Sequence, residues 1–379
     1  MKKNNKLFHR RLFLASGLAV GGASLLFSCK ENAQNQKPLS KIQTKENSFN
    51  LKMVTTWPKD FPGLGTSANR LADKINKASK GQINIKVYGS GELVPAYESF
   101  DAVRSGVADM CHDSPYYWIS KHPATVFFST LPSGLSALEQ TSWLLYGGGQ
   151  ELWNELYDRF NLVAFPSGNA GLQMFGWFKK ELNSLDDLKG LKVRMSGIHA
   201  EVLNRIGAIT VNIPGGEIMT SLQAGVVDGV EWGGPWMDLA FGFHKIVPFC
   251  YGPGLHEPGL NTSLTINKKI YETMSEDLKN IIKLCCFSEI SESIAEFNYR
   301  NTILYKELLE KHKVNFRILP KDIIRAWIEN SEIVIKEIAT RDDISKKIYN
   351  SWNYFRESSK NISEYYNLGF LQARKHYSK

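Results

Sequence analysis

The sequence predicts an α/β protein of two lobes with parallel-rich sheets and a helical C-terminal region. Three observations support this fold class. Short apolar segments alternate with segments of helical spacing after residue 48, a pattern typical of parallel sheets covered by helices. One helix–glycine–strand unit occurs twice. The chain beyond its N-terminal region has about 330 residues, which is large for a single hydrophobic core.

The first lobe is assigned to residues 51–145, together with part of 250–290. Strands are expected where apolar residues alternate or form short runs, and helices where they recur with helical spacing. In chain order the expected elements are a strand at Phe49–Thr56, a helix at Gly65–Ala78, a strand at Gln82–Tyr88, a helix at Tyr97–Arg104 capped by Gly106, and a strand at Val107–Cys111.

The repeated unit links the two lobes. Ala102–Asp109 and Ser221–Asp228 each have a helix end, a capping glycine and a short apolar strand that leads to an aspartate. The two copies are 119 residues apart, and a Gly-Glu pair precedes each, at Gly91-Glu92 and Gly216-Glu217. This similarity predicts two lobes of related structure.

The second lobe is assigned to residues 146–249, and a helical region over 275–379 is expected to pack across both lobes. The second-lobe segments with regular spacing are strands at Leu162–Phe165, Gln173–Phe178, Lys192–Met195 and Thr210–Ile213, and helices at Ser184–Leu188 and Ile198–Ile206. The C-terminal helical pattern is interrupted at Val314–Leu319. No segment after the N-terminal region is long and apolar enough to span a membrane.

Residues 1–28 have the features of an export signal. Arg10-Arg11 fits the twin-arginine pattern, and the apolar stretch Ala15–Phe27 is rich in small residues. Leu26–Cys29 resembles a bacterial lipobox. We therefore expect a periplasmic, extracytoplasmic lipoprotein that is exported by the twin-arginine route and anchored to a membrane through Cys29.

The segment 29–50 is polar and predicts a flexible linker between the lipid anchor and the folded lobes. Removal of the signal leaves 41 basic and 38 acidic residues and lowers the net charge from +8 to +3. The basic charge of the whole chain therefore belongs largely to the signal. It gives no support to nucleic-acid binding.

The motifs of common enzyme classes are absent from the sequence. It has no Gly-x-Ser-x-Gly elbow, phosphate loop, dinucleotide glycine fingerprint or His-Glu-x-x-His helix. Cys111, Cys250, Cys285 and Cys286 have neither CxxC nor zinc-site spacing, and whether two of them form a disulfide stays open. Without these motifs the chain has few residues for redox or phosphoryl chemistry, and polar groups that could bind a ligand remain the candidates for function.

Polar side chains within or directly after apolar strands are candidates for a ligand site. Gln173 lies in an apolar run, where a buried amide must be hydrogen-bonded. Arg194 lies within a predicted strand, and if it is buried its charge needs an anion. Its planar guanidinium can donate two parallel hydrogen bonds to a carboxylate. The alternative for Arg194 is an exposed position on an edge strand.

Two loops extend this candidate site. The apolar run Ala224–Val230 ends at Glu231 and Trp232, and ligands of open α/β sheets bind beyond such strand ends. A surface turn with a core tryptophan is the alternative. In the first lobe, Asp113-Ser114-Pro115-Tyr116-Tyr117 follows a strand end, and its alternative is a packed aromatic turn.

Three segments, Gln173–Glu181, Leu188–Met195 and Asp228–Trp232, together resemble one family. It is the extracytoplasmic solute-binding proteins of tripartite ATP-independent periplasmic (TRAP) transporters, in the branch that binds 2-oxo and 2-hydroxy acids such as pyruvate or lactate. The resemblance covers nearly all of residues 50–370. It implies the two-lobed fold of periplasmic binding proteins, with a cleft between the lobes.

The resemblance also implies a role for each matching residue. Arg194 would pair with the substrate carboxylate, and Gln173 would contact both the substrate and a bound cation. Glu231 would be a cation ligand. Trp232 would bind the cation through its backbone carbonyl and pack on the substrate. The first-lobe residues Pro115, Tyr116 and Tyr117 would touch the other end of the ligand.

Glu257 would be the further cation ligand, at a position where the sodium-binding members of the branch carry glutamine. This departure gives the site two carboxylates. Because oxygen ligands with more negative charge suit a divalent ion, we expect one metal cation and favour Ca²⁺ over Na⁺.

The sequence therefore predicts a solute-binding protein of a TRAP transporter, not an enzyme. It would capture a small 2-oxo or 2-hydroxy monocarboxylate with a cation and deliver it to the small and large membrane subunits. Two alternatives stay open. One is an extracytoplasmic metal-dependent enzyme acting on a 2-oxo acid, with His112 or His256 transferring protons. The other is a ligand-sensing partner of a membrane receptor.

The long C-terminal helical region is the expected surface of a homodimer, if one forms. Its apolar stripe has helical spacing, and packing within the chain explains the stripe equally well. The stripe consists of Leu304, Tyr305, Leu308 and Leu309.

Overall fold

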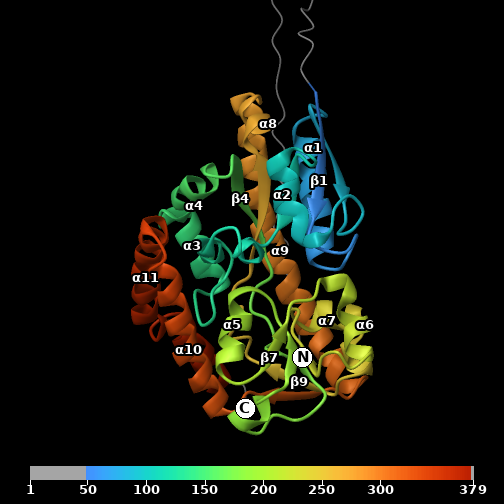
Figure 1. The fold of residues 1–379 in the computed structure, drawn as a ribbon, viewed down its shortest axis with the longest axis vertical. Helices are drawn as coiled ribbons and strands as arrows, with labels where there is room; N and C mark the ends of the chain where they lie inside the picture. Colours follow the sequence, from blue (N-terminus) through green and yellow to red (C-terminus); the bar gives the residue numbers. More distant parts are fainter. Residues whose placement is uncertain (1–47, 377–379) are drawn as a thin grey trace, which may run out of the picture. The chain divides into compact units, whose positions relative to one another are not determined.

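The computed structural model describes residues 48–376, which form two β-sheets with surrounding helices (Figure 1). The expected signal at 1–28, Cys29 and most of the linker lie outside the described residues. Strand β1 starts at Phe49, so the last residues of the range 29–50 already belong to a strand. Within residues 48–376, none of the helices has the length and apolarity needed to cross a membrane.

The first sheet has the strand order β2-β1-β3-β10-β4. β1 pairs in parallel with β2 and β3, as the alternation of strands and helices predicts, whereas β10 is antiparallel to β3 and β4. The strands are β1 (Phe49–Thr55), β2 (Ile83–Tyr88), β3 (Met110–Asp113), β4 (Leu162–Asn169) and β10 (Asn261–Asn267).

Burial follows the position of each strand in this sheet. The edge strand β2 buries Ile83 and Ile85 and exposes Asn84 and Lys86, the alternation of a strand with one covered face. All seven residues of the interior strand β10 are buried.

The second sheet has the order β11-β9-β5-β8-β6-β7. β6 is parallel to β7 and β8, β9 is parallel to β11, and β5 is antiparallel to β8 and β9. The strands are β5 (Gly176–Phe178), β6 (Lys192–Arg194), β7 (Ile209–Val211), β8 (Gly229–Val230), β9 (Phe249–Gly252) and β11 (Asn315–Ile318).

The chain passes from the first sheet to the second later than the sequence predicts. The expected lobe boundary lies between residues 145 and 146, but β4 belongs to the first sheet, and the second sheet begins with β5. Apolar spacing identifies β4 as a strand and does not show which sheet it joins, because that depends on pairing with the distant β10.

Helices cover both sheets and connect their strands. Those of the two lobes are α1 (Leu64–Ala78), α2 (Ser99–Ser105), α3 (Ala137–Tyr146), α4 (Gly149–Asp158), α5 (Gly197–Arg205), α6 (Ile218–Gln223), α7 (Pro235–Phe241) and α8 (Lys268–Glu272). The C-terminal helices are α9 (Glu276–Glu310), α10 (Lys321–Ala339), α11 (Asp343–Ser363) and α12 (Asn367–His376).

The repeated unit forms the same local structure in both lobes. The backbone N–H of Asp109 donates to the carbonyl of Lys52 on β1, and the Asp109 carboxylate accepts the Lys52 N–H at 2.6 Å. Asp228 makes both contacts with Lys192 on β6, at 2.7 and 3.1 Å. In each copy the aspartate therefore fixes the residues before its own strand to the neighbouring parallel strand, which is β1 in the first lobe and β6 in the second.

The Gly-Glu pairs that precede the two copies are not equivalent. Glu98 and Glu217 each lie directly before the helix of their unit, α2 and α6, whereas Glu92 lies further upstream. Glu98 is therefore the structural counterpart of Glu217. Glu92 is displaced from this position because the loop before α2 contains additional residues.

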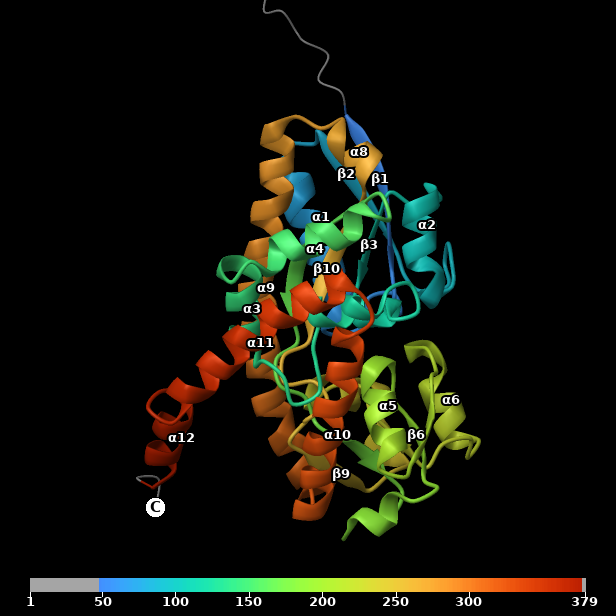
Figure 2. The same cartoon turned by 60° about the vertical axis from the view of Figure 1, so that its left-hand side comes forward.

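The long helix α9 contacts both lobes, β4 and α1 of the first and α7 of the second (Figure 1). Its apolar stripe packs partly within the chain, since Leu308 is buried and the ring of Tyr305 lies 4.6 Å from that of Phe316. Figure 2 shows α12 beyond the end of α11, and none of the residues of α12 is buried.

Candidate ligand and metal site

Arg194 lies at the end of β6, and only 1% of its surface is exposed. Its Nε donates to the carbonyl of Ile213 at 3.1 Å, and its Nη1 donates to the carbonyl of Glu231 at 2.7 Å and to the Glu231 carboxylate at 3.0 Å. Its buried Nη2 has no hydrogen-bond partner among the described residues. The exposed edge-strand alternative is thus wrong, and the guanidinium keeps donors for an anion.

Glu231 directly follows β8 and is buried beside two basic groups. Its Oε2 contacts Arg194, and its Oε1 lies 3.1 Å from Nε2 of His256. Burial alone would raise the pKa of Glu231, but His256 and Arg194 outweigh that effect, and the pKa lies below its usual value. This carboxylate is therefore held ionised.

Glu257 is buried in the loop that follows β9. Its Oε2 accepts a hydrogen bond from Nε2 of Gln173 at 2.6 Å, and its Oε1 lies 3.7 Å from Nδ1 of His199. Burial and the charge of Glu231 raise the pKa of Glu257 well above its usual value. Two carboxylates in one buried site repel each other, and a cation between them would remove that cost.

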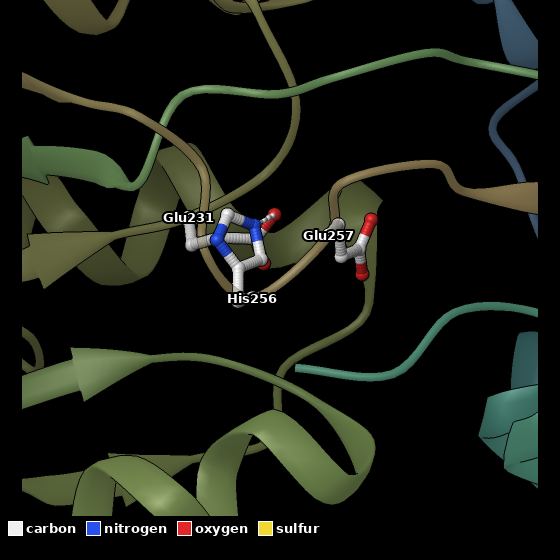
Figure 3. Close-up of side chains that lie close together, drawn as sticks. All are labelled: Glu231, His256 and Glu257. Carbon is white, nitrogen blue, oxygen red and sulfur yellow. Dashed lines mark ion pairs between the residues drawn. The ribbon is translucent and has the colours of Figure 1, made fainter. Parts of the chain in front are cut away.

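The sequence-predicted acids form a cluster with His256. Glu231, His256 and Glu257 carry ligand atoms that all lie within 4.8 Å of one another, and no other such group of three occurs within residues 48–376. Figure 3 shows the His256 ring beside Glu231, with Glu257 next to them. Two carboxylates and one imidazole can coordinate a divalent cation.

Gln173 completes the oxygen donors of this cluster. It lies in the loop before β5, not in the strand expected at Gln173–Phe178, because β5 begins at Gly176. Its backbone is fixed by Gly254, which donates to the Gln173 carbonyl at 3.0 Å. The side-chain Oε1 is buried and has no hydrogen-bond partner among the described residues. An amide oxygen of this kind fits a hard cation.

Trp232 lies against Arg194. The guanidinium carbon is 5.1 Å from the centre of the Trp232 ring, and the indole is only 6% exposed. Gly215 allows this position, because a Cβ there would come within 2.4 Å of the indole. The tryptophan is thus a core residue, as the alternative held, but the turn is not on the surface, because residues 231–235 are all buried. The indole nitrogen has no hydrogen-bond partner among the described residues.

The first-lobe tyrosines reach the same place from a 3₁₀ turn at Pro115–Trp118. Burial raises the pKa of Glu257, and a hydrogen bond from Tyr116 only partly opposes that rise; the Tyr116 ring lies 5.3 Å from the His199 ring. The Tyr117 ring lies 4.5 Å from that of Tyr116. The turn is a packed aromatic cluster and also part of the site, so the two interpretations of the sequence do not exclude each other.

Asp113 anchors this aromatic turn from behind. Its buried carboxylate accepts hydrogen bonds from Trp118 at 2.9 Å, from Cys111 at 2.9 Å and from Ser263. Burial raises the pKa of Asp113 to about 6, although these donors oppose the shift. Asp113 therefore holds the turn that carries Tyr116.

The residues proposed for the enzyme alternative lie in different surroundings. His112 is buried in β3, its Nδ1 accepts a hydrogen bond from Trp57 at 2.8 Å, and burial lowers its pKa to about 4. Its ring contacts Trp57, which is not one of the site residues. His256, in contrast, is part of the cluster.

His199 is a site residue that the sequence reasoning missed. It lies in the first turn of α5, is 1% exposed, and burial together with His256 lowers its pKa to about 3. A polar residue within the apolar helix Ile198–Ile206 was the only available signal. The cysteines Cys111, Cys250, Cys285 and Cys286 are free and buried, so none of these four forms a disulfide.

Known proteins of one family are similar to this chain. The family model for the bacterial extracellular solute-binding protein, family 7 (DctP), matches residues 53–342. A monocarboxylate 2-oxoacid-binding periplasmic protein of Nostoc is 33% identical over 353 residues, which cover 92% of this chain and 94% of the relative.

Two solved structures are also similar. A TRAP periplasmic solute-binding protein from Pseudoalteromonas atlantica, with bound sodium and pyruvate, has a TM-score of 0.82 and 34% identity over 86% of this chain and 99% of the other. One from Colwellia psychrerythraea, with bound calcium and pyruvate, has a TM-score of 0.82 and 35% identity over the same shares.

Proposed function

As the chain belongs to the DctP family of TRAP solute-binding proteins, which are receptors and not enzymes, we propose that it captures a pyruvate- or lactate-like monocarboxylate together with a metal cation. The main support is the arrangement around Arg194. Its buried Nη2 has no partner among the described residues, and it lies next to the carboxylate cluster. An anion at Arg194 and a cation at the glutamates would then be neighbours.

Each site residue has a role in this proposal. Arg194 binds the ligand carboxylate, and Trp232 covers the ligand. Gln173, Glu231, Glu257 and the Trp232 carbonyl hold the cation, which supplies a positive charge to the carboxylate and to the 2-oxo or 2-hydroxyl oxygen. The Nostoc relative is a 2-oxoacid-binding protein, and the two solved relatives contain pyruvate, which supports this class of ligand.

We favour Ca²⁺ as the cation on grounds of charge. With both glutamates ionised, Glu231, Glu257 and the ligand carboxylate would together carry three negative charges, which Arg194 and a divalent ion would balance. A sodium ion would leave one buried negative charge uncompensated, unless Glu257 kept its proton, and such charges are costly. One solved relative contains calcium and the other sodium, so relatives of this chain accommodate both ions.

Ligand exchange would require the lobes to separate, because the site residues of both lobes are buried. Tyr116 of the first lobe packs against His199 of the second, with ring centres 5.3 Å apart, so a ligand that contacts both lobes would favour the closed arrangement. The closed protein would then deliver its ligand to the small and large membrane subunits of a TRAP transporter.

Export by the twin-arginine route and lipid anchoring at Cys29 belong to the same proposal, and they rest on the N-terminal sequence alone. A homodimer through the C-terminal helices is likewise proposed. Exposed apolar side chains on α12 support it better than the α9 stripe, which packs partly within the chain. They are Leu368, Phe370 and Leu371.

A ligand screen tests the central proposal. Chelator-treated protein is titrated with 2-oxo and 2-hydroxy monocarboxylates, with and without Ca²⁺ or Na⁺, and the melting temperature is followed. We expect stabilisation that needs both a ligand and a cation. Recovery of unchanged ligand separates binding from the enzyme alternative. Stabilisation by Na⁺ and not by Ca²⁺ would remove the calcium assignment.

A further inference from the structure

Two aromatic side chains of the first lobe, Phe61 and Tyr97, contact second-lobe segments that hold Arg194. Neither belongs to the Pro115–Trp118 turn. Phe61 lies between β1 and α1, and Tyr97 lies just before α2. They reach the site residues from two separate loops of the first lobe.

A tight turn presents Phe61 to the second lobe. The preceding Asp60 has a left-handed backbone with φ of 55°, and its carboxylate accepts a hydrogen bond from Asn69 at 2.6 Å. The Phe61 N–H donates to the Pro58 carbonyl, and the Phe61 carbonyl accepts the N–H of Thr66. These contacts fix the direction in which the ring projects.

The ring of Phe61 packs on the residues that support the ligand site. Its centre lies 5.9 Å from that of Trp232 at an interplanar angle of 86°, and 4.5 Å from that of Phe241. Edge-to-face geometry of this kind is favourable for aromatic pairs. Trp232 also lies under the guanidinium of Arg194, so Phe61 holds the indole in the position that Arg194 needs.

Tyr97 contacts a different segment next to Arg194, the one that contains Asn212. Its hydroxyl donates to Oδ1 of Asn212 at 3.0 Å, and the same oxygen accepts a hydrogen bond from Ser196 at 2.8 Å. The next residue, Ile213, provides the carbonyl that accepts Nε of Arg194. Tyr97 thus contacts the segment that orients the guanidinium.

We infer that Phe61 and Tyr97 are positioning residues that stabilise the closed arrangement of the lobes around Arg194. We call their two inter-lobe contacts, with Trp232 and with Asn212, the latch. Both contacts join the lobes and are lost when the lobes separate. They would therefore slow the release of a bound ligand and would not speed its entry. The identity of that ligand rests on the proposed function, whereas the contacts themselves do not.

Stopped-flow measurement of association and release tests the inference, with pyruvate and Ca²⁺ as the probe. The variants are Phe61→Ala, Phe61→Tyr and Tyr97→Phe, and the fully exposed first-lobe residue Tyr146 provides the control Tyr146→Phe. We expect Phe61→Ala to raise the release rate roughly tenfold, from the loss of aromatic contacts. Tyr97→Phe should raise it about threefold, from the loss of one hydrogen bond.

Three results would support a latch over a general structural role. Association rates do not fall, any fall in the melting temperature of the ligand-free protein is too small to account for the loss of affinity, and Phe61→Tyr, which keeps the ring, restores slow release. Unchanged release in both Phe61→Ala and Tyr97→Phe would overturn the inference. A fall in the melting temperature of the ligand-free protein that is large enough to account for the whole loss of affinity would also overturn the inference.

Small-angle scattering of the ligand-free protein separates this inference from the proposed function. If the wild type binds no 2-oxo or 2-hydroxy acid, the proposed function fails, and the latch is still tested. Phe61→Ala and Tyr97→Phe should then increase the radius of gyration relative to Tyr146→Phe. Identical radii in all variants would contradict the latch, whatever the ligand.

Discussion

A single nitrogen of Arg194, Nη1, donates both to the backbone carbonyl of Glu231 at 2.7 Å and to its carboxylate at 3.0 Å. The predicted anion-binding residue is thus bonded to a predicted cation ligand. Any shift of one side chain moves the other. Ligand and cation should therefore bind with positive coupling, each raising the affinity for the other.

Arg194→Ala should abolish binding of the carboxylate ligand. Truncating one partner of a buried hydrogen-bonded charge pair costs about 2–5 kcal/mol. Arg194→Lys keeps the charge and loses the planar guanidinium that donates two parallel hydrogen bonds. It should therefore bind more tightly than Arg194→Ala and more weakly than the wild type. Calorimetric titration with pyruvate in the presence of Ca²⁺ measures both effects.

Arg205 provides the matched control for this experiment. It is an exposed arginine of the second lobe that pairs with Glu201 and Glu337, away from the site. Arg205→Ala should bind pyruvate like the wild type. Wild-type affinity in Arg194→Ala would show that the carboxylate binds elsewhere.

Glu257→Gln should shift the cation preference from Ca²⁺ towards Na⁺. The substitution removes one negative charge and keeps an oxygen that can accept the hydrogen bond from Gln173. Titration of chelator-treated protein with each ion, at saturating pyruvate, measures the preference. Glu217→Gln, an exposed substitution in the same lobe, is the control. An unchanged Ca²⁺ affinity in Glu257→Gln would exclude Glu257 as a cation ligand.

His256→Asn should weaken cation binding about 10- to 100-fold, the usual effect of removing a group that orients a ligand. His256 lies 3.1 Å from Glu231, so its loss frees that carboxylate to rotate. His244→Asn is the control, because the ring of His244 contacts His312, which is not a site residue. If both variants bind Ca²⁺ equally well, His256 neither ligates the cation nor orients Glu231.

The sequence predicted five residues of the second-lobe site because each has a local signature. Gln173, Arg194, Glu231, Trp232 and Glu257 are polar or aromatic residues that interrupt or follow apolar runs, within segments that resemble a known family. The structure brings them together, and their roles as ligands stay predictions. His199 has no such signature, since only the long-range packing of α5 buries it next to Glu257.

The same limit applies to the fold. The repeated helix–glycine–strand units were visible because their residues are close in sequence. The sheet that β4 joins was predicted wrongly, because it depends on pairing with β10, almost a hundred residues later. Phe61 and Tyr97 were missed for a related reason, since their partners Trp232 and Asn212 lie in the other lobe.

Asp113 should make stability depend on pH. Burial raises its folded-state pKa to about 6, above the ordinary value of 3.8. The folded state then holds a proton that the unfolded state has lost, so stability falls as the pH rises from about 4 to 6 and levels off above that. Urea unfolding of wild type and Asp113→Asn across this range isolates the effect.

In that comparison the stability of the wild type relative to Asp113→Asn should decrease from pH 4 to pH 6, because asparagine does not titrate. Other titrating groups are common to both proteins and cancel. A difference that is constant with pH would mean that Asp113 has an ordinary pKa in the folded protein. The donors Cys111, Trp118 and Ser263 would then dominate over burial.

Gly197→Ala and Gly190→Ala separate backbone strain from contact with the ligand site. Both glycines have a left-handed backbone, with φ of 63° and 71°, so alanine should cost about 1–2 kcal/mol of stability at each. Only at Gly197 would the new Cβ also meet the site, 2.7 Å from the Tyr116 ring; at Gly190 nothing lies within 4 Å. Thermal unfolding should therefore show a loss in both variants and the larger loss in Gly197→Ala, while calorimetry should show weaker pyruvate binding in Gly197→Ala alone. Equal affinities in the two variants would mean that the Tyr116 contact with α5 does not contribute to the closed site.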